Sequence, residues 1–231
     1  MFWKKSIDLL FPPRCAVCDG LITSEDKGIC DKCRGSLSYV TGPRCFCCGK
    51  TVESEETEYC GDCRKRKHSF DRGFPLLHYV PPVSDAMAAM KYHGRAEYAA
   101  FYGSLLAECF GREWETLKID CLIPVPVHKD KLKKRGYNQA ELLAEALGEI
   151  LQLPVDNRIL IRGEDTRAQK KLSRDERFMN LRSAFQPGSV TPPETVLLVD
   201  DIYTTGATAD ACAEVLFKAG AERVYITTVC C

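Results

Sequence analysis

Four Cys-x-x-Cys pairs dominate the first third of this chain and repeat at a single spacing. The pairs begin at residues 15, 30, 45 and 60, so eleven residues separate each pair from the next. One such turn can place two thiolates on one metal ion, and tetrahedral Zn²⁺ takes four thiolates at about 2.3 Å. The array therefore predicts two closed, structural Zn²⁺ sites. The predicted ligands are Cys15, Cys18, Cys30, Cys33, Cys45, Cys48, Cys60 and Cys63.

The sequence leaves alternatives to this interpretation. A disulfide framework would need an oxidising compartment, and nothing in the sequence indicates export. A redox-active dithiol would need only one pair, whereas four are repeated here. Sequential pairing of the ligands gives two tandem zinc ribbons, and a crossed arrangement is the alternative. Cys47, inside the third pair, is expected to be a spare thiol.

The distribution of residue types predicts two domains. Nine of the 14 cysteines lie between Cys15 and Cys63, where large aliphatic residues are sparse, and the rest of the chain has ordinary apolar runs. A hydrophobic core alone would hardly stabilise so small a segment, whereas metal sites would. We expect a double zinc-ribbon domain over residues 1–70 and a larger α/β domain over residues 71–231.

The net charge gives no general argument for a nucleic-acid or membrane partner. Lys plus Arg and Asp plus Glu number 32 each, so the net charge is zero. The N-terminal apolar run stops at Pro12 and Pro13, and no stretch approaches the roughly 18 apolar residues that span a bilayer. We therefore expect a soluble, cytoplasmic protein without membrane insertion. One local basic run, residues 64–68, is either a solvated face or a contact to nucleic-acid phosphates.

A second motif carries the chemistry of the C-terminal part. Residues 196–199 are apolar and predict a buried parallel strand, and residues 207–219 have the spacing of a helix that Gly220 ends. Between them stand two acids and a loop of small residues, which we call the threonine loop (residues 204–208). Backbone N–H groups and a helix N-terminus suit a terminal phosphate. Carboxylates suit a ribose diol and hydrated Mg²⁺.

This stretch resembles the 5-phosphoribosyl-1-pyrophosphate (PRPP) signature of type I phosphoribosyltransferases. The resemblance implies that PRPP is bound by Asp200, Asp201, Thr204, Thr205, Gly206, Ala207 and Thr208. The alternative is that the two acids merely cap a helix. Adjacent strand residues point to opposite faces, so both acids reach one ligand only if the strand has already turned at Asp201.

Upstream, a similar unit is expected. Residues 119–128 predict another buried strand, followed by a basic loop over residues 129–135 and a helix with one apolar face. The loop would neutralise pyrophosphate, or it is a solvated turn. The candidate residues of this unit are Val127, His128, Arg135, Asn138 and Gln139. A polar stretch over residues 162–180 is either a mobile lid over the site or an exposed charged helix.

Taken together, these motifs resemble the ComF family of competence proteins over nearly the whole chain. They are the cysteine array, the stretch Ile-Pro-Val-Pro-Val-His ending at His128, the stretch Arg-Gly-Tyr-Asn-Gln ending at Gln139, the spaced residues from Gln169 to Phe185, and the threonine loop. The resemblance implies a double zinc ribbon followed by a type I phosphoribosyltransferase fold, a parallel sheet with flanking helices. It also implies a role in natural transformation or in the use of external DNA. Single-stranded DNA and a helicase-like translocase are the implied partners.

Two functional hypotheses follow. The first is pentosyl transfer, in which a nitrogen nucleophile displaces pyrophosphate from C1′ of PRPP in the presence of Mg²⁺. Purine phosphoribosyltransferases carry an acidic residue at the position of Thr204, and a threonine cannot serve as their general base at neutral pH. Orotate enzymes also have threonine there, so transfer stays possible while the acceptor and the base are unidentified. The second hypothesis is a non-catalytic adaptor that binds single-stranded DNA and uses PRPP as a ligand.

Overall fold

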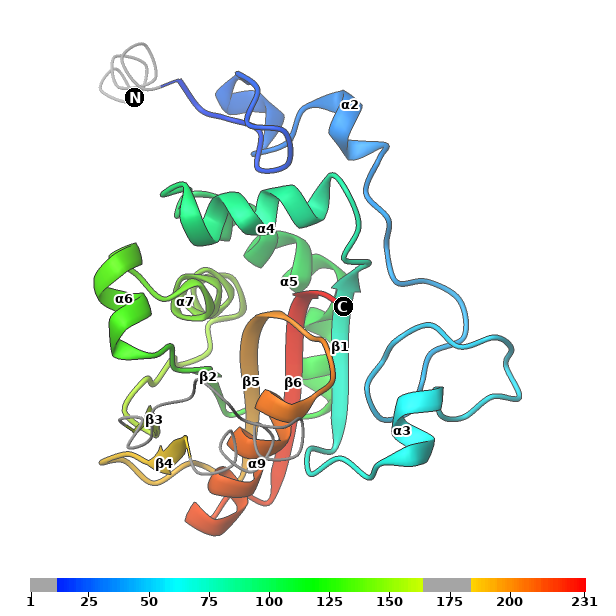
Figure 1. The fold of residues 1–231 in the computed structure, drawn as a ribbon, viewed down its shortest axis with the longest axis vertical. Coiled ribbons are helices and arrows are strands. Elements are labelled where there is room, and N and C mark those ends of the chain that lie inside the picture. Colours follow the sequence, from blue (N-terminus) through cyan, green and yellow to red (C-terminus); the bar gives the residue numbers. More distant parts are fainter. Residues whose placement is uncertain (1–11, 164–183) are drawn as a thin grey trace, which may run out of the picture.

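The computed structural model describes residues 12–163 and 184–231, and its centre is a four-stranded parallel sheet (Figure 1). The strand order is β1-β6-β5-β2. The strands are β1 (Arg72–Leu77), β2 (Cys121–Pro124), β5 (Thr195–Ile202) and β6 (Arg223–Cys230). Two short strands, β3 (Leu160–Arg162) and β4 (Phe185–Pro187), pair antiparallel in a separate sheet. The expected parallel sheet with flanking helices is confirmed.

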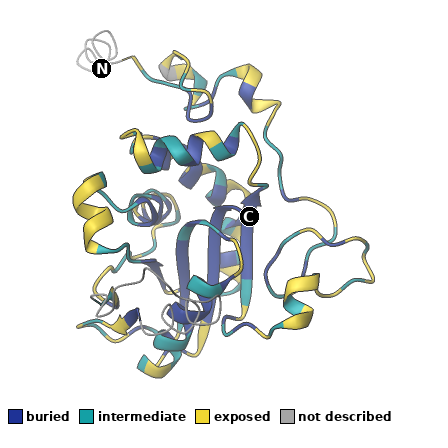
Figure 2. Ribbon diagram, viewed as in Figure 1, coloured by how far each residue is buried: buried dark blue, intermediate teal, exposed yellow. Residues whose placement is uncertain are grey.

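Apolar runs form the central strands because both faces of the sheet are covered. Val196 and Leu198 of β5 belong to the core beneath α9 (Ala207–Ala219). Leu197 and Val199 point the other way, into a second core with α5 (Tyr98–Thr116) and α7 (Gln139–Leu151). Figure 2 shows the central strands as the most buried part of the molecule. The predicted strand over residues 196–199 and the predicted helix over residues 207–219 are both confirmed.

The carboxyl ends of the parallel strands meet at one edge of the sheet, where the candidate residues gather. α4 (Val83–Tyr92) lies across this edge (Figure 1). The expected basic loop over residues 129–135 is instead a short helix, α6 (Lys129–Arg135). His128 caps its first turn, and Gly136, with a φ of 83°, ends it. These local caps stabilise a helix in a segment whose composition predicted a loop.

The cysteine-rich segments form short elements that pack on the larger α/β part. They are η1 (Ser24–Asp26), α2 (Asp31–Arg34) and α3 (Gly61–Lys65). The first two pairs lie over α4 and α5, and the last two lie beside β1 (Figure 1). Tyr102 of α5 donates a hydrogen bond to the Ala16 carbonyl at 3.1 Å. Among the residues that the structure describes, no helix is long and apolar enough to cross a bilayer.

Candidate functional site

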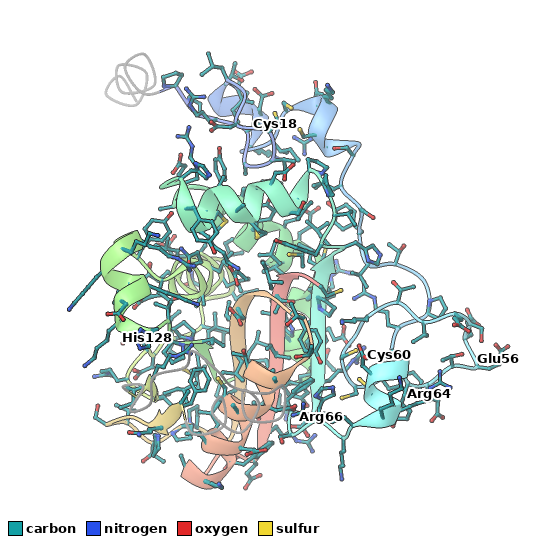
Figure 3. The ribbon with its side chains drawn as sticks, viewed as in Figure 1. Cys18, Glu56, Cys60, Arg64, Arg66 and His128 are labelled. Carbon is teal, nitrogen blue, oxygen red and sulfur yellow. The ribbon has the colours of Figure 1, made fainter. Side chains whose placement is uncertain are left out.

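The thiols of the four Cys-x-x-Cys pairs come together in two groups of four. The first cysteine group is Cys15, Cys18, Cys30 and Cys33, and the second cysteine group is Cys45, Cys48, Cys60 and Cys63. Within each group all sulfur atoms lie within 4.8 Å of one another. Sequential pairing is therefore confirmed, and Cys47 lies outside the second group as expected. Figure 3 shows Cys18 and Cys60, one from each group, on separate parts of the molecule.

The spacing of the sulfur atoms fits Zn²⁺ and excludes disulfides. Cys18 and Cys30 have their sulfur atoms 3.9 Å apart, and Cys48 and Cys60 have theirs 3.6 Å apart. A tetrahedron with Zn–S bonds of about 2.3 Å has edges of about 3.8 Å, whereas a disulfide bond is about 2.05 Å long. All cysteines of the chain are free thiols. The chain thus carries two zinc-binding sites, each closed by four cysteine ligands.

The same backbone turn builds both groups. The N–H of Cys15 donates to the Gly20 carbonyl, and the N–H of Cys45 donates to the Lys50 carbonyl, each at 2.8 Å. Within these turns Asp19 and Gly49 occupy the left-handed region, with φ of 61° and 73°. The shared turn accounts for the Cys-x-x-Cys spacing of the pairs that begin at Cys15 and Cys45, because it directs both thiols of a pair towards one point.

The thiols differ in how readily they ionise. Burial opposes ionisation of Cys15, but backbone N–H groups, that of Cys30 foremost, donate to its sulfur and lower its pKa to about 7. The pKa of Cys45 falls to about 7 in the same way. Burial raises the pKa of Cys33 and Cys63 instead. Four thiolates cannot stay charged together without a cation, so a dication is needed to complete each group.

The threonine loop connects the end of β5 to the start of α9. Gly206 is the N-cap residue of α9 with a φ of 76°, and its carbonyl accepts from the N–H of Asp210 at 2.8 Å. Thr204 and Thr205 are exposed, and Ala207 and Thr208 are half-buried. The N-terminus of α9 therefore follows a loop with two exposed threonines, where the N–H groups of its first turn and the helix dipole favour an anion.

The two acids lie at the end of β5, which does not turn at Asp201. The strand still pairs with β6 at Ile202, so Asp200 and Asp201 alternate between the two faces of the sheet. The turn that would bring both acids onto one ligand is not present here. Asp201 is instead paired with Lys91 of α4, whose Nζ lies 2.7 Å from its carboxylate.

Asp200 has its side chain directed back to its own backbone neighbour, the N–H of Asp201, at 2.9 Å. Burial and the adjacent charge of Asp201 raise the pKa of Asp200 to about 8. The surroundings at the end of β5 therefore do not stabilise the ionised form of Asp200. A cation at this point would lower the pKa of Asp200 and restore the balance.

The second predicted unit is built into the framework of the site. Asn138 caps α7 by accepting from the N–H of Ala140 at 3.2 Å, and it donates to the Val125 carbonyl at 3.0 Å. His128 accepts from the N–H of Asp130 at the start of α6 (Figure 3). Val127 is half-buried in the connection between β2 and α6. The predicted ligand contacts of these residues stay predictions.

Arg135 and Gln139 link this unit to α4. Arg135 donates to the Gln139 side chain at 2.8 Å, and Gln139 donates to the Met90 carbonyl at 3.2 Å. Gln139 is only 3% exposed, so its amide is a brace between helices. Met90 precedes Lys91, so this brace also fixes the helix turn that carries the partner of Asp201. Of the predicted lid, residues 164–180 lie outside the described part of the chain.

Sequence reasoning missed two groups at this site. One is Lys91, whose only signal was its place in a helix just before Tyr92. The other is Asp210 in the first turn of α9, which is 1% exposed and bonded to residues that follow the second cysteine group. The available signal for Asp210 was an acidic residue among alanines on the predicted helix over residues 207–219.

We expect zinc content to separate the ligands from the spare thiol. Cys48→Ser removes one of four thiolates of the second group, so the purified protein should hold about one Zn²⁺ per chain, compared with two in the wild type. Cys47→Ser is the matched control and should retain both ions. Inductively coupled plasma mass spectrometry measures the content. Equal loss in the two variants would contradict the grouping.

We expect Asp200 to make stability depend on pH. Its pKa is raised on folding, so the folded state binds more protons than the unfolded state, and stability falls as the pH rises towards 8. Between pH 6 and pH 8.5 the wild type should therefore lose about 2 kcal/mol of stability that Asp200→Asn keeps, or about 4–8 °C in Tm. Thermal unfolding without divalent cations or phosphate measures this. Asp85→Asn, an exposed acid of α4, should show no such gain; parallel pH profiles for wild type and Asp200→Asn would contradict the prediction.

Comparisons with known proteins agree with this geometry. Residues 6–64 match the family model of the double zinc ribbon domain. Competence protein F of Haemophilus influenzae is 31% identical over 219 residues, which cover 92% of this chain and 94% of that protein. DNA utilization protein YhgH of Escherichia coli is 30% identical over 155 residues, 66% of this chain and 68% of that protein. Competence protein ComFC of Streptococcus pneumoniae is 33% identical over 147 residues, with 63% and 62% covered. With its two four-cysteine groups and its parallel sheet, the chain belongs to the competence protein F (ComF) family.

Proposed function

We propose that this chain binds PRPP with Mg²⁺ at the carboxyl end of β5 and acts in DNA uptake or in the use of external DNA. The observation that supports PRPP as the ligand is that Asp200 and Asp201, the threonine loop and the N-terminus of α9 follow one another at this edge of the sheet. The DNA role rests on relatives whose names refer to competence and DNA utilization.

The threonine loop would hold the 5-phosphate. Thr204 and Thr205 are exposed, so an incoming anion can approach the loop just before the N-terminus of α9. These groups and the helix dipole are already oriented, so little reorganisation is needed on binding. The hydroxyl groups of Thr204, Thr205 and Thr208 add donors that can follow the phosphate oxygens.

The acids would hold the ribose. Both acids would reach one ribose only if ligand binding turned the end of β5 at Asp201. The carboxylate of Asp201 would then accept a hydrogen bond from a ribose hydroxyl once Lys91 releases it, and Asp200 would accept another after it ionises. Carboxylates at this edge also fit Mg²⁺, which binds few protein oxygens and shares the phosphates of the substrate. When bound there, Mg²⁺ would neutralise the pyrophosphate as it leaves C1′.

Transfer from PRPP needs an acceptor and a route for its proton. The acceptor nitrogen would attack C1′ while the bond from C1′ to the pyrophosphate oxygen breaks, and the pyrophosphate would leave with the electron pair. The hydroxyl of Thr204 stays protonated at neutral pH and does not act as a general base. Binding is therefore the proposed function, and pyrophosphate release with candidate nitrogen acceptors would extend it to transfer.

We expect Asp200→Asn combined with Asp201→Asn to abolish PRPP binding. The double variant keeps the shape of both side chains but removes the charge that holds the ribose and Mg²⁺. Isothermal titration calorimetry with PRPP and Mg²⁺ should show at least a hundredfold loss, about 2.7 kcal/mol. Asp85→Asn is the control and should bind like the wild type. Unchanged affinity of the double variant would rule out this site.

A DNA contact is the second candidate function, and the orientation of the basic run favours it. Arg64, Lys65 and Lys67 are exposed, whereas Arg66 turns inwards and pairs with Asp210 at 3.0 Å (Figure 3). Three exposed cations within four residues of sequence are available to phosphates of single-stranded DNA. A helicase-like translocase stays a proposed partner on the family resemblance alone.

We expect neutralisation of the three exposed cations to weaken binding of single-stranded DNA. Arg64→Gln, Lys65→Gln and Lys67→Gln together should lower the affinity and reduce the salt slope by about 2, since each phosphate contact contributes about 0.7. Fluorescence anisotropy over a salt series measures both. Arg112→Gln, Lys118→Gln and Lys218→Gln remove the same charge from other positions and are the control. Equal effects in the two triple variants would point to net charge and contradict a local DNA surface.

A further inference from the structure

We propose that Lys50, two residues after Cys48 of the second cysteine group, positions the threonine loop, so that the second zinc site is part of the phosphate-binding machinery. This inference rests on the proposed function of the loop. It assigns a role to a residue 154 positions away from the loop in sequence. It also gives the second zinc site a task beyond stabilising its own segment.

The contact between Lys50 and the loop is direct. Lys50 donates from Nζ to the carbonyl oxygen of Thr204 at 2.7 Å. Its ammonium also lies over the ring of Tyr203, 5.1 Å from the centroid, where the ring face attracts a cation. In a trans peptide the carbonyl and the following N–H point in opposite directions. Holding the Thr204 carbonyl towards Lys50 therefore turns the N–H of Thr205 away from Lys50.

The zinc knuckle determines where Lys50 lies. Lys50 follows Cys48 by two residues, and its carbonyl closes the turn by accepting from the N–H of Cys45. Close backbone contacts with Gly73 hold this turn against β1. A Cβ added to Gly49 would lie 2.2 Å from the Gly73 carbonyl oxygen, and the N–H of Gly73 donates to the Cys47 carbonyl at 2.7 Å. Coordination of one ion thus fixes the backbone from which Lys50 reaches the loop.

Residues 68–70, which follow Cys63, also contact the threonine loop and the first turn of α9. His68 is 3.0 Å from the carboxylate of Asp210 in the first turn of α9, and the N–H of Ser69 donates to that carboxylate at 2.8 Å. His68 also stacks on Phe70. A Cβ added to Gly206 would approach the His68 ring within 2.6 Å. The loop backbone therefore rests on side chains that follow directly after the second cysteine group.

The two cysteine groups contact different parts of the molecule. In the first group, Asp19 accepts hydrogen bonds from Arg95 at 2.7 Å and from Tyr98, at the junction of α4 and α5. Among the described residues, only the second group is shown in contact with the threonine loop, through Lys50. Zinc binding at the second group would therefore restrict the loop before any ligand arrives, and ordering a binding loop in advance increases affinity.

The test compares Lys50→Met with Lys50→Arg and with Lys32→Met, an exposed lysine in α2 of the first group. Hydrogen exchange of the amides over residues 204–208 is measured in the ligand-free protein, and affinity for PRPP with Mg²⁺ is measured by calorimetry. Lys50→Met should speed exchange about fivefold and weaken affinity about tenfold. Lys50→Arg keeps the charge and a donor, so it should restore most of both. Lys32→Met should match the wild type, and all variants should retain two Zn²⁺ and the wild-type Tm.

The exchange measurement keeps this inference separate from the proposed function. If Lys50→Met leaves exchange over residues 204–208 unchanged, Lys50 does not position the loop and the inference is overturned. If the wild type binds no PRPP, the proposed function fails, and the exchange rates alone decide the role of Lys50. If Lys50→Met exchanges faster over residues 204–208 but binds PRPP with the wild-type affinity, the link between Lys50 and phosphate binding is overturned.

Discussion

Thiolate coordination is the constraint on which the N-terminal third of this protein depends. This segment has few large aliphatic side chains, so it cannot bury enough apolar surface to fold by packing alone. Two groups of four thiols replace that core, and each group repeats the same backbone turn. These turns also position two side chains that contact the α/β part: Asp19 contacts the α4–α5 junction, and Lys50 contacts the threonine loop. The metal sites therefore help to position segments that are distant from them in sequence.

The second constraint is the placement of two adjacent carboxyl groups at the carboxyl end of β5. Asp200 and Asp201 are neighbours on a strand whose interior is apolar, and Lys91 is paired with only one of them. Burial and the charge of Asp201 raise the pKa of Asp200, which is the expected cost of placing two carboxylates in such surroundings. Stability that is lost in this way at a strand end is commonly recovered when a ligand or cation binds.

Much of the fold could be predicted because its signals are local. The apolar run at residues 196–199 and the helical spacing of residues 207–219 indicate β5 and α9 directly. The regular spacing of the cysteines predicted both metal groups, including the exclusion of Cys47. The segment from Lys129 to Arg135 was wrongly expected to be a loop, because its helix depends on the caps His128 and Gly136 and not on an apolar face.

The amino-acid sequence determined the ligand types, their spacing and the order of strand, acids, loop and helix, because each of these is a property of neighbouring residues. Only the tertiary structure decided what those residues contact. It brought Lys91 to Asp201, Lys50 to Thr204 and His68 to Asp210, which are contacts between segments distant in sequence. Such contacts follow from how the sheet, helices and zinc knuckles pack together, and no local pattern encodes the direction in which a single lysine or histidine will point.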